Sequence, residues 1–414
     1  MLNVATPTTR AQSSAGSLRR EGRLAALDGL RLCAALLVVL YHFVGTAKSH
    51  IWVHHNAEEF GLLYKFATYG YLGVQLFFMI SGFVICMSSW DRSLRDFFIS
   101  RTVRLFPMYW VAIVISTIVV RLNKPLADAT TVIHGPKTLS DLLVNFTMAQ
   151  DAFGVPSVDA VYWTLWAELR FYLLFAIVVA MGLTYKRVLA FCMLWMVAGI
   201  FTYGMTDNPW VQLIIQPAYM PYFVAGVLLY LVHRFGSTPL LWGLVGVCLL
   251  IAQHQVLLDT RHFNQFLPAD MQWIFSAALL CAFFAAVSAV ALGWLSWARW
   301  KWLTVAGAMT YPLYLLHQDI GVITIRTLKG KVAAWPLLFA AIAGLLVLAY
   351  LCHRLIERPF APRLKQMLRA SFDFNPRPRT IPAQRTAPPQ ETVPPAPPAA
   401  VAERRAGDEQ VVEV

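Results

Sequence analysis

Apolar residues along this chain gather into long segments that are separated by short polar stretches. Most segments hold about 17 to 24 residues and contain few charged side chains. A helix of ~20 apolar residues spans the ~30 Å hydrocarbon layer of a bilayer. The pattern therefore predicts an all-α, polytopic membrane protein with about ten transmembrane helices. The predicted segments are 29–47, 71–89, 106–121, 169–184, 187–204, 211–232, 239–256, 272–293, 303–323 and 333–355.

The composition agrees with this pattern. Hydrophobic residues make up 58% of the 414 residues and charged residues 14%, whereas soluble globular chains carry roughly 45–50% and about 25%. The six cysteines lie in or beside apolar segments and form no C-x-x-C pair, so we expect neither disulfides nor a metal site. A soluble enzyme, a secreted disulfide scaffold and a nucleic-acid-binding globule are excluded, despite the net charge of +12.

The distribution of Lys and Arg predicts the orientation. With both termini inside, inner segments carry 23 Lys and Arg residues and outer loops carry 9. Positive charges concentrate on the cytoplasmic side of membrane proteins. We therefore expect an N-in, C-in topology, and the inner loop 90–105, with four arginines, gives the clearest local signal.

Both ends of the chain differ in character from the apolar middle. Residues 1–23 are rich in Ser, Thr and Ala and carry four arginines, which predicts a disordered basic arm. Nine prolines fall between 376 and 398, and such a composition cannot bury enough apolar surface to fold. We expect a transmembrane domain over 24–362 and a disordered Pro-rich cytoplasmic tail over 370–414.

The first predicted helix carries two ionisable side chains, Arg31 and His42. At ~100° per residue their spacing of 11 residues places them on one face of the helix, with a rise of ~16 Å between them. Arg31 then lies near the cytoplasmic edge and His42 near the midplane. Ionisable residues inside a span are functional candidates, here an anion-binding group and a general base. The alternative is a snorkelling arginine and a histidine that hydrogen-bonds a neighbouring helix.

Further charged groups stand at the predicted membrane boundaries. Arg101 and Arg104 are at i,i+3 on the inner side and therefore share one helix face. They either anchor the chain or grip a phosphorylated ligand. Glu168 lies at the outer entry of the fourth predicted helix. It is a surface charge, an ion-pair partner of Arg170, or a polar group that faces a cavity.

Five segments resemble the successive signatures of the acyltransferase-3 family of integral-membrane acyltransferases. The segments are LDGLRLCAALLVVLYH, GVQLFFMISGFVI, RTVRLFPMYW, WTLWAELRFY and TYPLYLLH. The resemblance covers residues 24–362 and is specific because the five motifs agree in order and in topological position. Thr164 and Thr310 stand where the family usually has serine, and both keep the hydroxyl group.

The resemblance implies an O-acyltransferase. Such an enzyme moves an acyl group, most often acetyl, from cytoplasmic acyl-CoA to a hydroxyl of a surface or exported glycan such as lipopolysaccharide or another polysaccharide. The family's Arg/His pair maps onto Arg31 and His42, its R-x-x-R onto Arg101 and Arg104, and its acid onto Glu168. We expect the R-x-x-R pair to bind the CoA phosphates. Acetyl-CoA is then a substrate, and no metal or permanently bound cofactor is expected.

Two roles are open for His42 in this scheme. It deprotonates the acceptor hydroxyl as a general base, or it takes the acyl group itself in a two-step transfer. Glu168 is expected on the far side of the membrane, where it orients a sugar hydroxyl or holds its helix in place.

The expected setting is the bacterial inner (plasma) membrane. The expected partners are acyl-CoA, a glycan or glycolipid acceptor and membrane lipid, without nucleic acid, and the oligomeric state stays open. The alternative function is a polytopic transporter or flippase of a glycan or lipid-linked intermediate. That class often shows internal repeats, and we find none in this sequence.

Overall fold

A computed structural model gives the arrangement of the helices. The described residues are 24–46, 51–123, 138–205, 208–266 and 271–372. These residues form helices and connecting segments, with no β-strand among them. The predicted basic arm lies outside the described residues, as does the predicted tail from residue 373 onward, so the expected disorder of both stays a prediction.

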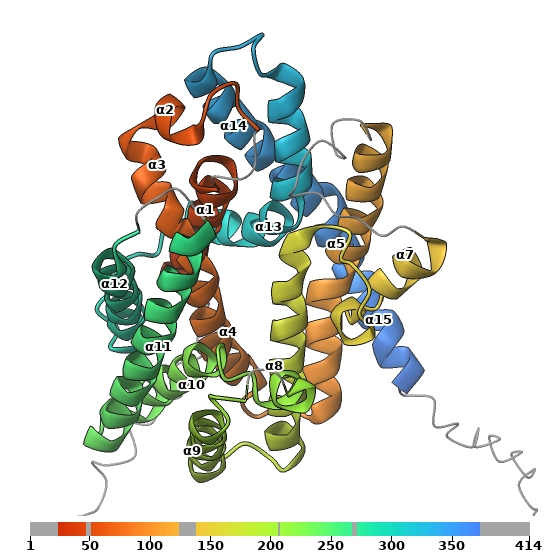
Figure 1. Ribbon diagram of the computed structural model, residues 1–414. Coiled ribbons are helices and arrows are strands. Elements are labelled where there is room, and N and C mark those ends of the chain that lie inside the picture. Colours follow the sequence, from red (N-terminus) through yellow and green to blue (C-terminus); the bar gives the residue numbers. More distant parts are fainter. Residues whose placement is uncertain (1–23, 47–50, 124–137, 206–207, 267–270, 373–414) are drawn as a thin grey trace, which may run out of the picture. The chain divides into compact units, whose positions relative to one another are not determined.

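Within the described residues, ten long helices correspond to the ten predicted segments (Figure 1). They are α1 (Ala25–Leu40), α4 (Gly73–Ser89), α5 (Leu94–Leu122), α8 (Trp163–Ala180), α9 (Tyr185–Phe201), α10 (Met220–Phe235), α11 (Pro239–Phe266), α12 (Trp273–Ala291), α13 (Lys301–Leu328) and α14 (Ala334–Cys352). Eight helical stretches are long and apolar enough to cross a membrane. The all-α, polytopic membrane class is therefore confirmed.

Two of the ten predicted spans fall outside those eight stretches. Helix α9 has only 17 residues, and α13 combines Pro312 with polar and charged side chains such as His317 and Asp319. Both helices nevertheless pack in the bundle with their neighbours. The inner and outer sides of the bundle stay a prediction from the charge distribution.

Shorter helical elements connect the long helices. They are η1 (Tyr41–Gly45), α2 (Asn56–Phe60), α3 (Leu62–Ala67), η2 (Thr68–Leu72), α7 (Leu139–Asn145), η3 (Gln150–Phe153), η4 (Ala160–Tyr162), η5 (Val211–Ile215), η6 (His353–Glu357) and α15 (Arg358–Phe372). Three of them, η1, η5 and η6, are π-helical. The first of these π-turns carries His42.

Helix α5 begins well before the predicted limit of residue 106. Ser93 caps it by accepting a hydrogen bond from the backbone N–H of Asp96 at 3.1 Å, and its hydroxyl donates to the Asp96 carboxylate at 2.9 Å. A capping serine satisfies a free N–H group of the first turn. As a result Arg101 and Arg104 belong to the same continuous helix as the apolar residues that follow them, and the predicted inner loop 90–105 is shorter than expected.

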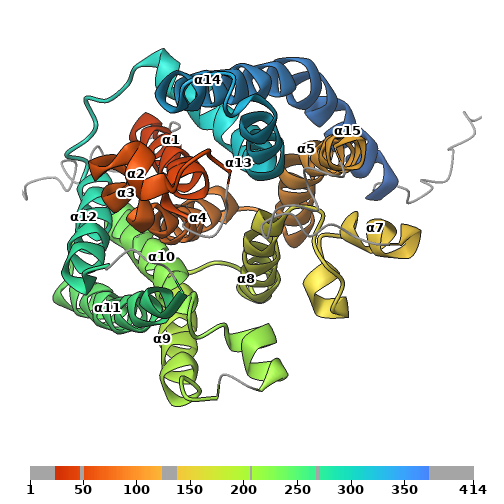
Figure 2. The ribbon, with the colours of Figure 1, turned by 45° about the horizontal axis from the view of Figure 1, so that its top comes forward.

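The centre of the bundle is formed by α1, α4, α10 and α13. Figure 2 shows α13 between α1 and α5 and close to α14, and α13 packs closely against all three of these helices. Helix α10 packs against α4, and all its residues from Met220 to Val232 are buried. A helix that is apolar all round is typical of such an interior position.

Two glycines set the distance between α13 and α1. A Cβ atom on Gly307 would lie 2.4 Å from the Cβ of Asp28, and one on Gly321 would lie 2.2 Å from the Cζ of Phe43. Small residues let membrane helices approach closely. Asp28 lies near the start of α1, and Phe43 lies in the π-turn η1 that follows α1. The part of α13 between Gly307 and Gly321 is therefore held close to α1 and η1.

Candidate active site

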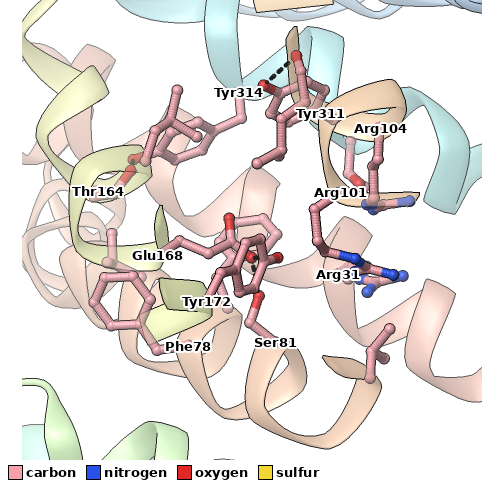
Figure 3. Close-up of a pocket in the computed structure, with 16 residues that line it drawn as sticks. Arg31, Phe78, Ser81, Arg101, Arg104, Thr164, Glu168, Tyr172, Tyr311 and Tyr314 are labelled. Atoms are coloured by element: carbon pink, nitrogen blue, oxygen red, sulfur yellow. Dashed lines mark hydrogen bonds between the residues drawn. The ribbon is translucent and has the colours of Figure 1, made fainter. Parts of the chain in front are cut away.

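A cavity lies between α1, α4, α5, α8 and α13. Its wall includes four of the five residues that the sequence singles out, namely Arg31, Arg101, Arg104 and Glu168 (Figure 3). These residues come from three helices that are distant in the sequence. The fifth candidate, His42, is not part of the wall.

The three arginines gather on one side of the cavity (Figure 3). Arg31 lies 3.3 Å from the carboxylate of Asp28, and its side chain is 13% exposed. Arg101 donates hydrogen bonds to Ser88 at 2.9 Å and to the neighbouring Ser100 at 3.2 Å. Arg104 is exposed, and in the described part of the chain its guanidinium has no hydrogen-bond or ion-pair partner. One guanidinium is therefore free to bind a ligand.

Glu168 lies in the same cavity as the arginines, where its carboxylate accepts hydrogen bonds from Ser81 on α4 and Tyr172 on α8. The guanidinium of Arg101 lies 5.7 Å from the centre of the Tyr172 ring. Of the three roles that the sequence leaves open for Glu168, this geometry supports a polar group that faces a cavity, and the side of the membrane on which it lies stays a prediction. The side chain points inward from α8 and shares the arginine-lined space.

An ion pair between Glu168 and Arg170 is absent from the described residues. Arg170 donates instead to the carbonyl of Gln212 at 2.5 Å, and its guanidinium lies 5.4 Å from the centre of the Trp166 ring. Side chains two positions apart on a helix, such as Glu168 and Arg170, point in different directions. Glu168 therefore faces the cavity while Arg170 ties α8 to the segment before α10.

The charges in the cavity wall do not balance. Three guanidinium groups face a single carboxylate, and Asp28, which lies beside Arg31, is not part of the wall. Guanidinium groups bind carboxylate and phosphate oxygens through paired, charge-assisted hydrogen bonds. The cavity is therefore suited to an anionic ligand.

Thr164 and Thr310, the two threonines singled out in the motifs, both line this cavity. The Thr164 hydroxyl lies 2.8 Å from the hydroxyl of Tyr314 and donates to the carbonyl of Val161 at 2.9 Å. Thr310 donates to the carbonyl of Gly307 at 2.8 Å. Their hydroxyls are thus engaged with the protein, and Thr164 holds the Tyr314 ring at the wall.

His42 lies in the π-turn η1, outside the lining of the cavity. Its Nδ1 atom is 2.9 Å from the carbonyl of Val38 and 3.1 Å from Nε2 of His317. His317 is fully buried, and its own Nδ1 lies 2.7 Å from the carbonyl of Tyr314. Insertions of π-helix are frequent at functional sites. A chain of contacts therefore runs from the cavity wall through Tyr314 and His317 to His42.

His317 is the last residue of the motif TYPLYLLH, but it is not among the candidate site residues predicted from the sequence. An ionisable residue inside a predicted span was the available signal. The contact with His42 joins residues 275 positions apart, so no local pattern contains it.

A buried carboxyl group links the outer connection to α13. Asp159 accepts hydrogen bonds from the backbone N–H groups of Val161 and Asp319, both at 3.2 Å. Burial raises the pKa of Asp159 above its ordinary value, because removal from water disfavours the charged form.

In the described residues no group of three or more His, Cys, Asp or Glu side chains is placed to hold a metal ion.

The arrangement combines a positive cavity with a pair of histidines next to it. The cavity can hold an anionic ligand by its arginines. A histidine can accept a proton near neutral pH or act as a nucleophile. Together these features suit the transfer of a group from an anionic donor.

Comparisons with known proteins agree with such chemistry. A family model described as an acyltransferase domain, Acyl_transf_3, matches residues 24–354. Acyltransferase MdmB of Streptomyces mycarofaciens is 25% identical over 387 residues, covering 82% of this chain and 92% of MdmB. The peptidoglycan O-acetyltransferase OatA of Listeria monocytogenes is 28% identical over 163 residues, covering 36% of this chain and 23% of OatA. No solved structure matches the chain significantly.

Proposed function

The chain belongs to the Acyl_transf_3 family of acyltransferases, and on this premise we propose that it is an acyl-CoA-dependent O-acyltransferase. It moves an acyl group, in the first instance acetyl, from acyl-CoA to a hydroxyl of a surface or exported glycan. The chain is a multi-pass membrane protein by its apolar helices and its family. We place it in the bacterial inner (plasma) membrane, with the donor on the cytoplasmic side.

The arginine-lined cavity is the observation that carries the proposal. CoA bears a pyrophosphate and a 3′-phosphate, and three guanidinium groups face the cavity with one carboxylate among them. Arg104, which has no hydrogen-bond or ion-pair partner among the described residues, is the natural first contact for a phosphate.

The transfer itself requires the thioester to reach His42. Tyr314 lines the cavity and its backbone carbonyl contacts His317, so we propose that the pantetheine arm passes this residue. The acceptor oxygen then forms a bond to the acyl carbon, the thioester C–S bond breaks, and CoA leaves as its thiol. His42 either takes the hydroxyl proton or first carries the acyl group.

Glu168 has a supporting role in this proposal. It accepts hydrogen bonds from α4 and α8 and offsets part of the arginine charge. That position supports holding α8 in place, one of the two roles expected from the sequence, more than contact with a sugar on the opposite side.

The acceptor is proposed by class only. OatA is named for O-acetylation of peptidoglycan, and we extend that idea to glycans in general, including peptidoglycan, lipopolysaccharide and exopolysaccharide. The alternative function is that of a transporter or flippase. Such a protein would need no acyltransferase activity and would not consume a thioester.

Two measurements test the proposal together. The purified protein is supplied with radiolabelled acetyl-CoA, and glycans of a deletion strain are compared with those of its parent by mass spectrometry. We expect label to leave CoA in the presence of a glycan fraction, and one acyl group to be missing from a glycan of the deletion strain. A transporter would leave acetyl-CoA intact and change glycan location rather than acylation.

A further inference from the structure

The contact between His42 and His317 determines where the protons of both rings lie. His317 Nε2 is 3.1 Å from His42 Nδ1, and the ring centres are 5.0 Å apart with an interplanar angle of 62°. Each Nδ1 atom also lies near a backbone carbonyl, that of Val38 for His42 and that of Tyr314 for His317. A carbonyl oxygen can only accept a hydrogen bond, and a neutral imidazole has one N–H donor and one acceptor nitrogen.

Only one arrangement of two neutral rings satisfies all of these contacts. His317 Nδ1, 2.7 Å from the Tyr314 carbonyl, must carry the proton, so its Nε2 is an acceptor. His42 Nδ1 must then be the donor toward His317 Nε2, and the same N–H points to the Val38 carbonyl at 2.9 Å. The reverse assignment would set a nitrogen lone pair against a carbonyl lone pair at both Nδ1 atoms. The Nε2 atom of His42 is therefore left without a proton.

We propose that His317 is a positioning residue for His42. This inference rests on the proposed function, in which His42 is the general base or the nucleophile. His317 Nε2 and the Val38 carbonyl together hold His42 as the Nδ1–H tautomer, so that Nε2 is the basic atom for chemistry. As a second acceptor beside the Val38 carbonyl, His317 Nε2 also stabilises the positive charge that develops on the His42 ring when its Nε2 takes a proton or an acyl group.

In the general-base route every proton that is transferred is accounted for. The acceptor hydroxyl gives its proton to His42 Nε2 while its oxygen attacks the thioester carbon. The CoA sulfur departs and finally takes that proton, which returns His42 to its starting form. The Nδ1 proton stays between His42, Val38 and His317 throughout. Each histidine ring thus keeps its hydrogen bonds at every stage.

The surrounding packing supports a positioning role. His317 is fully buried, whereas His42 is only partly buried, so the two rings are not equivalent, and His42 is the ring to which the proposed function assigns the substrate. Gly321 on α13 lets the helix approach Phe43, the neighbour of His42, which brings His317 up to the π-turn. Tyr314, whose carbonyl orients His317, also lines the donor cavity.

The first test compares two variants of similar size, His317→Leu and His317→Gln. Leucine removes the acceptor, whereas the glutamine amide oxygen can accept from His42 Nδ1 at the place of Nε2. We expect kcat for acyl transfer to fall by about 10- to 100-fold in the leucine variant, with KM for acyl-CoA within about twofold of wild type, since His317 does not line the cavity. The glutamine variant should recover most of kcat. An equal loss in both variants, or full activity in the leucine variant, would overturn the inference.

A second test does not depend on activity. Protein with ¹⁵N-labelled histidine is measured in lipid by solid-state NMR, and the His42 signals are assigned from the His42→Ala variant. We expect His42 to carry its proton on Nδ1 and to have an unprotonated Nε2. A proton on Nε2 would overturn the inference even if transfer proceeds. If the tautomer is as expected but no acyl group is transferred by wild type, the proposed function fails and the assignment of the histidine pair stands.

Discussion

Glu168 lets charge and hydrogen bonding be separated at a single residue. Its carboxylate accepts from Ser81 and Tyr172 in a cavity that also contains three arginines. Glutamine keeps an acceptor oxygen for these hydroxyls but removes the negative charge. Alanine removes both.

We expect Glu168→Gln to bind CoA about 3- to 10-fold more tightly than wild type. Removing one negative charge near the donor phosphates removes about 1 kcal/mol of repulsion. Titration of CoA into the detergent-solubilised protein measures this change. Glu168→Ala is the comparison variant and should in addition lower the melting temperature, because α4 and α8 lose their shared acceptor. Weaker CoA binding by the glutamine variant would contradict an anion-binding cavity.

Gly321 shows how the spacing of two elements controls the site. A Cβ atom at this position would lie 2.2 Å from the Phe43 ring, and that ring is fully buried. We expect Gly321→Val to push α13 away from η1, at a cost of about 1–3 kcal/mol, and to separate His317 from His42. Acyl transfer should fall by about tenfold or more, while CoA binding at the arginines is retained.

Gly344→Val is the matched control on the neighbouring helix α14. A Cβ atom there meets no atom within 4 Å, so the same chemical change should leave transfer within about twofold of wild type. Both variants are compared at equal membrane abundance for turnover of labelled acetyl-CoA. Similar losses in the two variants would mean that valine disturbs the membrane helices in general rather than the contact between α1 and α13.

The elements were predictable to different degrees. Hydropathy located all ten long helices, because length and apolar content define a span. It missed the first turns of α5, since the arginines there lower the local hydropathy. The capping pair Ser93 and Asp96 was the signal that would have placed this helix start. The π-turn that carries His42 has no comparable sequence signal.

The candidate site was predictable in its members but less so in its geometry. Arg31, Arg101, Arg104 and Glu168 line one cavity. The sequence placed the arginines near one another and left a cavity-facing position for Glu168 as one of three alternatives, but it did not predict that Glu168 shares the arginines' cavity. The position of a residue within a predicted span indicates its depth along its own helix. It does not indicate which other helices it faces, and this cavity is lined by five helices. Contacts such as that between His42 and His317 depend on how closely α1 and α13 pack, and hydropathy contains no interhelical distance.

At the scale of the whole molecule, the segment after α15 can be separated from the transmembrane domain. Residues 373–414 contain the nine prolines noted above, a composition unsuited to a packed core. We expect their deletion to leave insertion and acyl transfer nearly unchanged, because the apolar helices by themselves make insertion effectively irreversible. Glycan acylation is measured at matched membrane abundance. A loss of more than about tenfold, equivalent to ~1.4 kcal/mol in a barrier, would indicate that this segment takes part in the reaction.

The central claim is that the arginine-lined cavity holds the acyl-CoA donor. The most direct measurement is the affinity of CoA for three proteins at low and high salt: wild type, Arg101→Ala with Arg104→Ala, and Arg92→Ala with Arg363→Ala. The control pair removes the same charge from exposed positions that do not line the cavity. We predict that the cavity variant loses about 30-fold or more in affinity and much of its salt sensitivity, while the control stays close to wild type. Equal CoA affinity in all three proteins would contradict the assignment of this cavity to the donor.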